Sequence, residues 1–150
     1  MALVLRQPLA FENVSGGWEL RNRYFKGCRG CKDISYLPWS RDGPSTVCAV
    51  FEGFIDYLSA LTLDIISGAD AIILNSVVNV NKAVPYLTNY TVINCYLDHD
   101  NAGQTALAEL TAIYGSTVID RSTLYSEFND LNDFLVNQSF TQNTLPNENK

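Results

Sequence analysis

Short apolar runs alternate with amphipathic segments from residue 46 onward. Four runs are short, apolar and rich in β-branched residues, which predicts strands over residues 46–51, 71–75, 91–97 and 116–120. Apolar residues recur at helical spacing between and after these runs, which predicts helices over residues 53–66, 81–89, 101–115 and 130–138. Because the strands lack polar alternation, the pattern predicts a parallel α/β sheet with helices on both faces.

The first 45 residues follow a different pattern. A Gly-Gly turn opens residues 16–27, which predicts a hairpin or small sheet, and the turn-rich residues 40–45 predict a hinge. The last residues are polar, so we expect a flexible tail. The sequence therefore predicts an N-terminal subdomain over residues 1–45, an α/β core over residues 46–138 and a tail over residues 139–150.

The charges are distributed unevenly along this chain of 150 residues. The formal net charge is −6 at pH 7, but residues 1–41 carry +4 and residues 42–150 carry −10. An ordinary polar surface accounts for this asymmetry, and on composition alone we favour it. The alternative is a basic arm for phosphates joined to an acidic part that attracts cations.

Cysteine usage and the absence of export signals suggest a location. No apolar run reaches the roughly 20 residues that a membrane helix needs, and the first residues lack a signal-peptide pattern. We therefore expect reduced thiols, a cytoplasmic protein and no membrane partner. Cys28 and Cys31 form a single C-x-x-C pair, whereas a structural zinc site usually takes four ligands, so no zinc is expected.

Carboxylates follow two of the four predicted strands directly. Ligands of open α/β sheets bind outside the carboxyl ends of the strands. The residues at those ends are Glu52, Asn75 with Ser76, Asp98 with Asp100, and Asp120. Asp98 and Asp100 alternate on an extended segment, so both carboxylates can face one point, and Mg²⁺ takes such oxygen ligands. A solvated turn is the alternative for an isolated D-x-D.

The other polar candidates each have a structural alternative. Asp56 lies one helical turn after the first motif, where a carboxylate also offsets the helix dipole. Asp130, Asn132 and Asp133 open the last helix, where Asp and Asn are good caps. We expect His99 to be an exposed residue and not a ligand. The order of the motifs, after the first, third and fourth strands, favours a site over three unrelated turns.

This arrangement resembles the Toprim domain of primases, topoisomerases, some nucleases and recombination mediators. Glu52 in "FEGFIDYLS" matches the glutamate of the family's first motif, and "LDHDNAG" matches its D-x-D with Asp98 and Asp100. The motif forms are closest to the DnaG-type bacterial DNA primases. Residues 16–35 resemble primase-like proteins of Bacteroides-type mobile elements.

The third motif departs from the primase pattern. Primases carry Asp-x-Asp there; Asp130 matches the first position, but Asn132 stands at the second. Either Asn132 binds the metal through its carbonyl or through water, or Asp133 substitutes. The number of metal ions therefore stays open.

The resemblance implies a fold and an activity. The fold is a Toprim Rossmann-like parallel sheet of about four strands flanked by helices, with a small basic N-terminal α+β subdomain. The activity is metal-dependent nucleotidyl transfer that makes short RNA primers on single-stranded DNA from NTPs, with Mg²⁺ or Mn²⁺. A replicative helicase is the implied partner of the full-length protein. The chain has no room for the zinc-binding and helicase-binding regions of bacterial primases, so we expect a fragment or a reduced protein, and an isolated chain without activity is compatible with this interpretation.

The resemblance also implies site residues. The catalytic residues are Glu52, Asp98 and Asp100, and the metal set adds Asp130, Asn132 and Asp133. Phosphate or nucleotide contacts are assigned to Arg21, Lys26, Lys32 and Asp56. Trp18, Tyr24 and Phe25 lie between these charges and could stack on bases, although we expect at least two of them to form the core of the subdomain.

Two alternative functions remain. One is a different Toprim activity, of the nuclease or topoisomerase type. The other is a nucleic-acid-binding module whose acidic site has decayed, which Asn132 favours.

Overall fold

The structure is a computed structural model that describes residues 7–22, 24–40, 42–43 and 45–143. Its strands are β1 (Leu9–Glu12), β2 (Trp18–Arg21), β3 (Lys26–Arg29), β4 (Ser35–Leu37), β5 (Val47–Phe51), β6 (Asp70–Ile73), β7 (Val92–Tyr96) and β8 (Val118–Asp120). Its α-helices are α1 (Phe54–Thr62), α2 (Val80–Leu87), α3 (Asn101–Tyr114) and α4 (Leu131–Asn143). Short 3₁₀ turns cover η1 (Val77–Asn79), η2 (Gly115–Thr117) and η3 (Ser122–Tyr125). Each strand and helix predicted from residue 46 onward is therefore confirmed, with shifted ends.

The larger sheet has the strand order β4-β6-β5-β7-β8. Strands β5, β6, β7 and β8 are parallel, as predicted, and β4 pairs antiparallel with β6 at the edge. The sheet thus has one more strand than the sequence predicted. Residues 35–37 belong to the segment assigned to the N-terminal subdomain, but Ser35 lies opposite Ile73 in this sheet. A three-residue edge strand carries too little local pattern to reveal a partner far along the chain.

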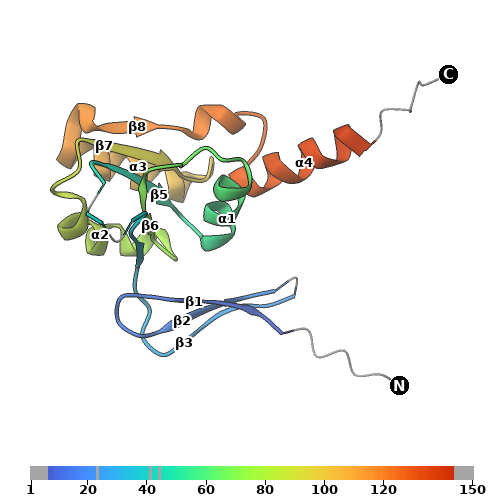
Figure 1. Ribbon diagram of the computed structural model, residues 1–150, viewed down its shortest axis with the longest axis horizontal. Helices are drawn as coiled ribbons and strands as arrows, with labels where there is room; N and C mark the ends of the chain where they lie inside the picture. The colour runs from blue at the N-terminus through green and yellow to red at the C-terminus, as the bar shows by residue number, and fades with distance from the viewer. Residues whose placement is uncertain (1–6, 23, 41, 44, 144–150) are drawn as a thin grey trace.

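Helices cover both faces of the larger sheet (Figure 1). Alternate residues of β5 divide between two apolar clusters. Cys48 and Val50 belong to the cluster that includes buried residues of α2 and α3, whereas Ala49 and Phe51 belong to the one that includes residues of α1 and the start of α4. Burial on both faces explains why the strand sequences read as continuous apolar runs.

A separate antiparallel sheet, β1-β2-β3, lies beside the larger sheet (Figure 1). It contains the hairpin predicted over residues 16–27, and β1 extends it. Phe11 of β1 stacks on Phe54 of α1 with ring centroids 4.7 Å apart, which docks this sheet against the core. The described residues before β5 form strands and no helix, which is the β part of the expected α+β subdomain. Its central strand β2 pairs antiparallel with both β1 and β3.

The C-terminal helix is longer than predicted. Helix α4 continues to Asn143, so residues 139–143 are helical and not part of a flexible tail. The rest of the predicted tail, residues 144–150, lies outside the described residues, as do residues 1–6. None of the helices in the described part of the chain is long and apolar enough to cross a membrane.

The strand order fixes where a ligand can enter. The chain passes from β5 to β6 on one side and then returns to β7 on the other side of β5. In such sheets a crevice opens where the order reverses, outside the carboxyl ends of the two strands. Glu52 follows β5 and Asp98 lies just beyond β7, so both residues border this crevice.

Candidate active site

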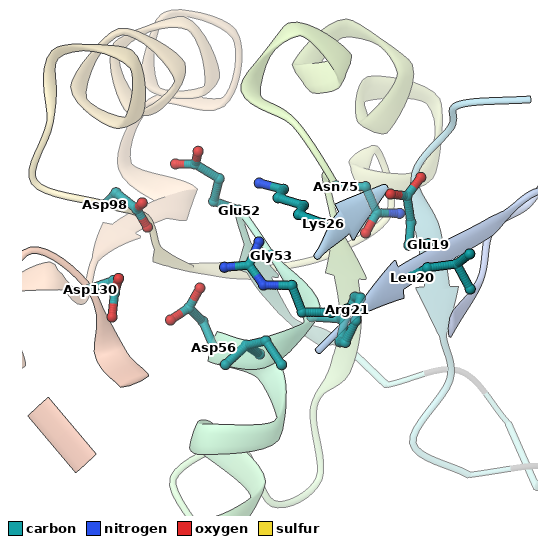
Figure 2. Close-up of a pocket in the computed structure, with 12 residues that line it drawn as sticks. Glu19, Leu20, Arg21, Lys26, Glu52, Gly53, Asp56, Asn75, Asp98 and Asp130 are labelled. Atoms are coloured by element: carbon teal, nitrogen blue, oxygen red, sulfur yellow. The ribbon is translucent and has the colours of Figure 1, made fainter. Parts of the chain in front are cut away.

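A pocket lies between the N-terminal sheet and the carboxyl end of the larger sheet (Figure 2). One wall is acidic, and the other, from the hairpin, carries two basic side chains together with Glu19. The acidic side chains come from four segments of the core and the basic ones from the hairpin: Glu52, Asp56, Asp98 and Asp130, facing Arg21 and Lys26. In the described part of the chain no ion pair within 4 Å joins the two walls. The walls thus face each other across a space that can hold a ligand.

The β2–β3 register directs the basic side chains into the pocket. Arg21 and Lys26 are directly opposite each other in adjacent strands, so both side chains lie on one face of the sheet. Phe11, opposite Glu19, lies on that same face and packs on the core. The sheet therefore turns this face toward the carboxylates, and Figure 2 shows Arg21 and Lys26 extending toward them.

The two aspartates of the D-x-D motif have different surroundings. Asp98 is half-buried and lines the pocket. Asp100 is exposed and is the N-cap of α3, where its Oδ1 accepts a hydrogen bond of 2.8 Å from the Gly103 amide. A Cβ at Gly103 would lie 2.2 Å from the Asp98 carbonyl oxygen, so glycine is required for α3 to begin against this peptide. Asp100 and Gly103 together hold Asp98 in place.

His99 is half-buried, which corrects the expectation of an exposed residue. Its amide donates a hydrogen bond of 2.8 Å to the Asn129 carbonyl, and its Nδ1 contacts the Phe128 carbonyl oxygen. Its ring also packs against Tyr125, with centroids 5.3 Å apart. These partners lie about 30 residues further along the chain, so local pattern could not reveal them. His99 ties the loop that carries Asp130 to the end of β7.

The third motif forms the start of α4. Asp130 Oδ1 accepts a hydrogen bond of 2.8 Å from the Asp133 amide, and Asp56 Oδ1 accepts one of 3.2 Å from the Asn132 amide. The Asn132 side-chain oxygen accepts a hydrogen bond of 3.3 Å from the Ser59 hydroxyl, which engages it on α1. Of this motif Asp130 lines the pocket, while Asp133 is exposed on the first turn of α4.

Burial and mutual repulsion raise the pKa of three carboxyls in this pocket. Burial raises the pKa of Glu52 to about 7, and the charges of Asp98 and Asp100 add to the rise. Burial, with the charges of Asp130 and Asp98, raises the pKa of Asp56 to about 7. Burial, with Asp130 and Asp100, raises the pKa of Asp98 to about 6. The site thus concentrates negative charge that its own basic residues do not neutralise.

The donor chemistry of the pocket fits a hard divalent cation. Glu52 Oε2 is buried without a hydrogen-bond partner, and the neighbouring carboxylates offer only oxygen. No group of three or more Asp, Glu, His or Cys among the described residues is arranged to hold a metal ion in the present side-chain positions. Any metal ion would therefore need side-chain rotation around Glu52 and Asp98.

Some predicted residues lie outside this pocket. Lys32 is exposed and lines an adjacent pocket that also contains Lys26, Cys28 and Ser76. Asp120, after β8, accepts a hydrogen bond of 2.9 Å from the Ser122 amide in a local turn. Cys28 and Cys31 are free thiols.

The expectation that aromatic residues form the core of the N-terminal subdomain is wrong. Trp18, Tyr24 and Phe25 are 41%, 69% and 52% exposed. Trp18 alternates with Glu19 along β2 and so lies on the sheet face away from the pocket. The Phe25 ring lies over Gly27. The small sheet docks through Phe11 and contains too few residues to enclose these rings.

Two polar side chains of the pocket were not predicted as site residues. Glu19 is 8% exposed and lines both pockets, on the same strand face as Arg21. Asn75 also lines both, and it lies two residues after the end of β6 at Ile73. Its place after a strand that borders the crevice was the available signal.

The comparisons with known proteins identify the family. The family model described as Toprim-like matches residues 49–135, more than half of the chain, so the chain belongs to the Toprim-like family. A model described as a domain of unknown function matches residues 7–30. No curated protein matches the chain.

Solved structures share the fold. The primase fragment of the bacteriophage T7 primase-helicase protein aligns with a TM-score of 0.65 and 17% identity, over 87% of this chain and 58% of that fragment. A chain from the structure of the T7 lagging-strand DNA polymerase interacting with primase domains of two gp4 subunits, bound to an RNA/DNA hybrid and dTTP, aligns with a TM-score of 0.62 and 15% identity, over 88% of this chain and 71% of that one. The chain therefore has a primase-like fold and spans little more than half of the T7 primase fragment.

Proposed function

We propose that this chain is the catalytic core of a DNA primase-type nucleotidyltransferase that makes short RNA primers on single-stranded DNA. One observation carries the proposal: the pocket at the strand-order reversal has a carboxylate wall and a facing wall with Arg21 and Lys26. Nucleotidyl transfer needs both, because the incoming triphosphate is anionic and its divalent cations require carboxylates.

We assign the metal contacts to Glu52, Asp98 and Asp130, and a supporting position to Asp100 as the cap of α3. Mg²⁺ or Mn²⁺ bound there would stabilise charge on the attacking and leaving oxygens. Asn132 or Asp133 is the assisting group; the Asn132 oxygen lies 3.3 Å from the Ser59 hydroxyl, which also donates to the Ile55 carbonyl at 3.0 Å.

The chain's own residues supply binding and proton transfer. Arg21 and Lys26 bind the triphosphate and orient its α-phosphate toward the primer 3′-hydroxyl. That hydroxyl attacks the α-phosphate, a new phosphodiester bond forms and pyrophosphate leaves. Glu52 either binds the metal with Asp98 and Asp130 or, if it stays free of the metal, accepts the hydroxyl proton. Asp56 lines the pocket and its Oδ1 accepts from the Asn132 amide, so its main assigned role is to position α4 beside the nucleotide.

A primer-synthesis assay tests the proposal. The chain, and a longer protein that contains it, is incubated with single-stranded DNA, NTPs and Mg²⁺ or Mn²⁺, and short RNA products are resolved on gels. We expect Asp98→Asn to reduce product at least about 100-fold, as loss of a metal-binding group does. Glu109→Gln, at an exposed position of α3, should leave the yield unchanged. Product that survives Asp98→Asn would refute the site assignment.

The same assay separates the other functions. Degradation of the template in place of primer synthesis would indicate a Toprim nuclease. Binding of single-stranded DNA without either reaction would indicate a non-catalytic module, which the engagement of Asn132 by Ser59 favours. A replicative helicase as partner of the longer protein is tested by co-purification and by stimulated primer yield.

A further inference from the structure

The pocket contains a second buried oxygen with an unmet hydrogen bond. In the described part of the chain, the buried side-chain oxygens without a partner are Glu52 Oε2 and Asn75 Oδ1, and both residues line the same pocket. A buried polar atom without a partner costs free energy, on the order of 1–3 kcal/mol, so both atoms indicate a ligand. Glu52 belongs to the cation site, whereas Asn75 requires a separate explanation.

The Asn75 side chain is held in one orientation. Its Nδ2 donates hydrogen bonds of 2.9 Å to the Asp33 carbonyl and 3.0 Å to the Ser35 hydroxyl oxygen. A backbone carbonyl only accepts, so the amide nitrogen must face Asp33 and the oxygen must face away from it. Ser35 is fixed in turn, because its hydroxyl donates to the Glu12 carbonyl at 2.9 Å. Oδ1 is therefore the one polar atom of this side chain left for a ligand.

The backbone at Asn75 is also unusual. Its φ of 60° lies in the left-handed region, which asparagine tolerates better than most residues. The segment before it is anchored, since the Leu74 amide donates to the Phe51 carbonyl at 2.8 Å and Asn79 Nδ2 donates to the Leu74 carbonyl at 2.9 Å. The acceptor thus sits on a rigid support at the carboxyl end of β6.

The surroundings of Asn75 carry both charges, because Glu19 and Lys26 line both pockets with it. Figure 2 shows Asn75 on the side of the pocket away from Asp98 and Asp130. Lys26 already supplies a cationic group to this part of the pocket, so we assign the carbonyl oxygen to an O–H or N–H donor of the ligand.

We propose that Asn75 Oδ1 accepts a hydrogen bond from a ribose hydroxyl of the incoming nucleotide. This inference rests on the proposed function, in which Arg21 and Lys26 hold the triphosphate. The ribose is joined directly to the phosphates, so its hydroxyls are the nucleotide's nearest donors to these two residues. The base lies further along the molecule.

Equilibrium binding tests this assignment without catalysis. The affinities of ATP, 2′-deoxy-ATP and 3′-deoxy-ATP for the chain are measured by calorimetry in the presence of Mg²⁺. We expect ATP to bind about 3- to 10-fold more tightly than one of the two deoxy analogues, the size of one net hydrogen bond. Equal affinities of the wild-type chain for all three would overturn the proposal.

Asn75→Gly removes the acceptor without backbone strain, because glycine adopts a positive φ readily. ATP affinity should fall to that of the weaker analogue, while the affinity of that analogue stays unchanged. Asn89→Gly, in the exposed turn after α2, is the matched control and should bind all three as the wild type does. An equal loss for all three nucleotides in Asn75→Gly would assign Asn75 to pocket shape or base contact and overturn the ribose assignment.

The outcomes separate this inference from the proposed function. A wild-type chain that binds no nucleotide refutes both. Primer synthesis with an unchanged ratio of ATP to deoxy-ATP affinity in Asn75→Gly refutes only the role of Asn75. If Asn75→Gly does not fold by circular dichroism, the analogue series with the wild-type chain still decides.

Discussion

Two acidic residues at opposite edges of the same sheet have opposite surroundings. Asp70 begins β6 at the amino edge and is fully buried, and its carboxylate accepts hydrogen bonds from the Trp39 amide at 2.8 Å and the Tyr90 hydroxyl at 2.7 Å. The Tyr36 hydroxyl and the Ser45 amide donate two more, each at 3.3 Å. Glu52 follows β5 at the carboxyl edge, where one of its oxygens is buried without a partner.

The contrast separates a structural carboxylate from a functional one. Asp70 has four donors and joins β6 to the segment before β5, so its negative charge is matched within the fold. The carboxylates near Glu52 repel one another, which raises their pKa values. A fold keeps such a cluster only at a cost in stability, and that cost points to an absent ligand. Removing the charge of Asp70 should therefore lower the free energy of unfolding, whereas removing the charge of Glu52 should raise it.

The largest loss of stability is expected at Asp70, whose carboxylate is fully hydrogen-bonded. Asp70→Ala removes a fully buried carboxylate that accepts from the Trp39 amide and the Tyr90 hydroxyl, so the free energy of unfolding should fall by about 3 to 5 kcal/mol. Urea denaturation followed by circular dichroism measures this loss. The control is Glu109→Ala, an exposed change on α3 that should shift the free energy by less than about 0.5 kcal/mol. A loss as small as that control at Asp70 would contradict a structural role for its hydrogen bonds.

The second effect acts on the backbone that carries Asp98. A methyl group at residue 103 would overlap the Asp98 carbonyl, so Gly103→Ala should cost about 1 to 3 kcal/mol and displace the aspartate. Urea denaturation gives the stability, and calorimetric titration with Mn²⁺ gives the metal affinity. Gln104→Ala, at the exposed neighbouring position, should change neither. Wild-type Mn²⁺ affinity in Gly103→Ala would show that Asp98 does not depend on this close approach.

The sequence predicted the elements better than the roles of their side chains. Local patterns place β5 and β7 and their terminal carboxylates, because burial on both faces leaves a direct imprint on strand composition. The fixed amide of Asn75 depends instead on Asp33, and the contacts of His99 depend on Phe128, both distant in sequence. Strand β4 is visible only through its pairing with β6. These features arise from nonlocal geometry, which periodicity does not encode.

The third effect is a pH dependence of the free energy of unfolding, caused by the acidic pocket. The folded state raises the pKa of Asp56 from near 4 to about 7, so the native state holds a proton that the unfolded chain releases. This contribution to stability is fully present below about pH 4 and is lost as the pH rises through about 7. In metal-free protein Asp56 alone should therefore lower the free energy of unfolding by about 3 to 4 kcal/mol between pH 4 and pH 8, and Glu52 and Asp98 act in the same direction.

Asp56→Asn identifies the group responsible. The amide oxygen can still accept from the Asn132 amide, but the side chain no longer titrates, so much of the decline should disappear. Asp42→Asn, at an exposed position, should keep the wild-type slope. Stability that rises with pH in the metal-free wild type would contradict the raised pKa.

The smallest expected change in stability is that of a substitution at Glu52. At pH 8 its carboxylate is charged and faces Asp98 and Asp100, so Glu52→Gln should stabilise the metal-free protein by about 1 kcal/mol. Neutralising Asp70 should not stabilise the protein, because it removes the acceptor of several donors. Added Mg²⁺ should reverse the order: at tenfold above its dissociation constant it stabilises the wild type by about 1.4 kcal/mol, and the variant by much less. Thermal unfolding with and without Mg²⁺ measures both, with Glu127→Gln, an exposed substitution of the same type, as the control. Equal Mg²⁺ stabilisation of the wild type and Glu52→Gln would mean that the orphaned oxygen has no cation to bind, and that the strain at this edge has another cause.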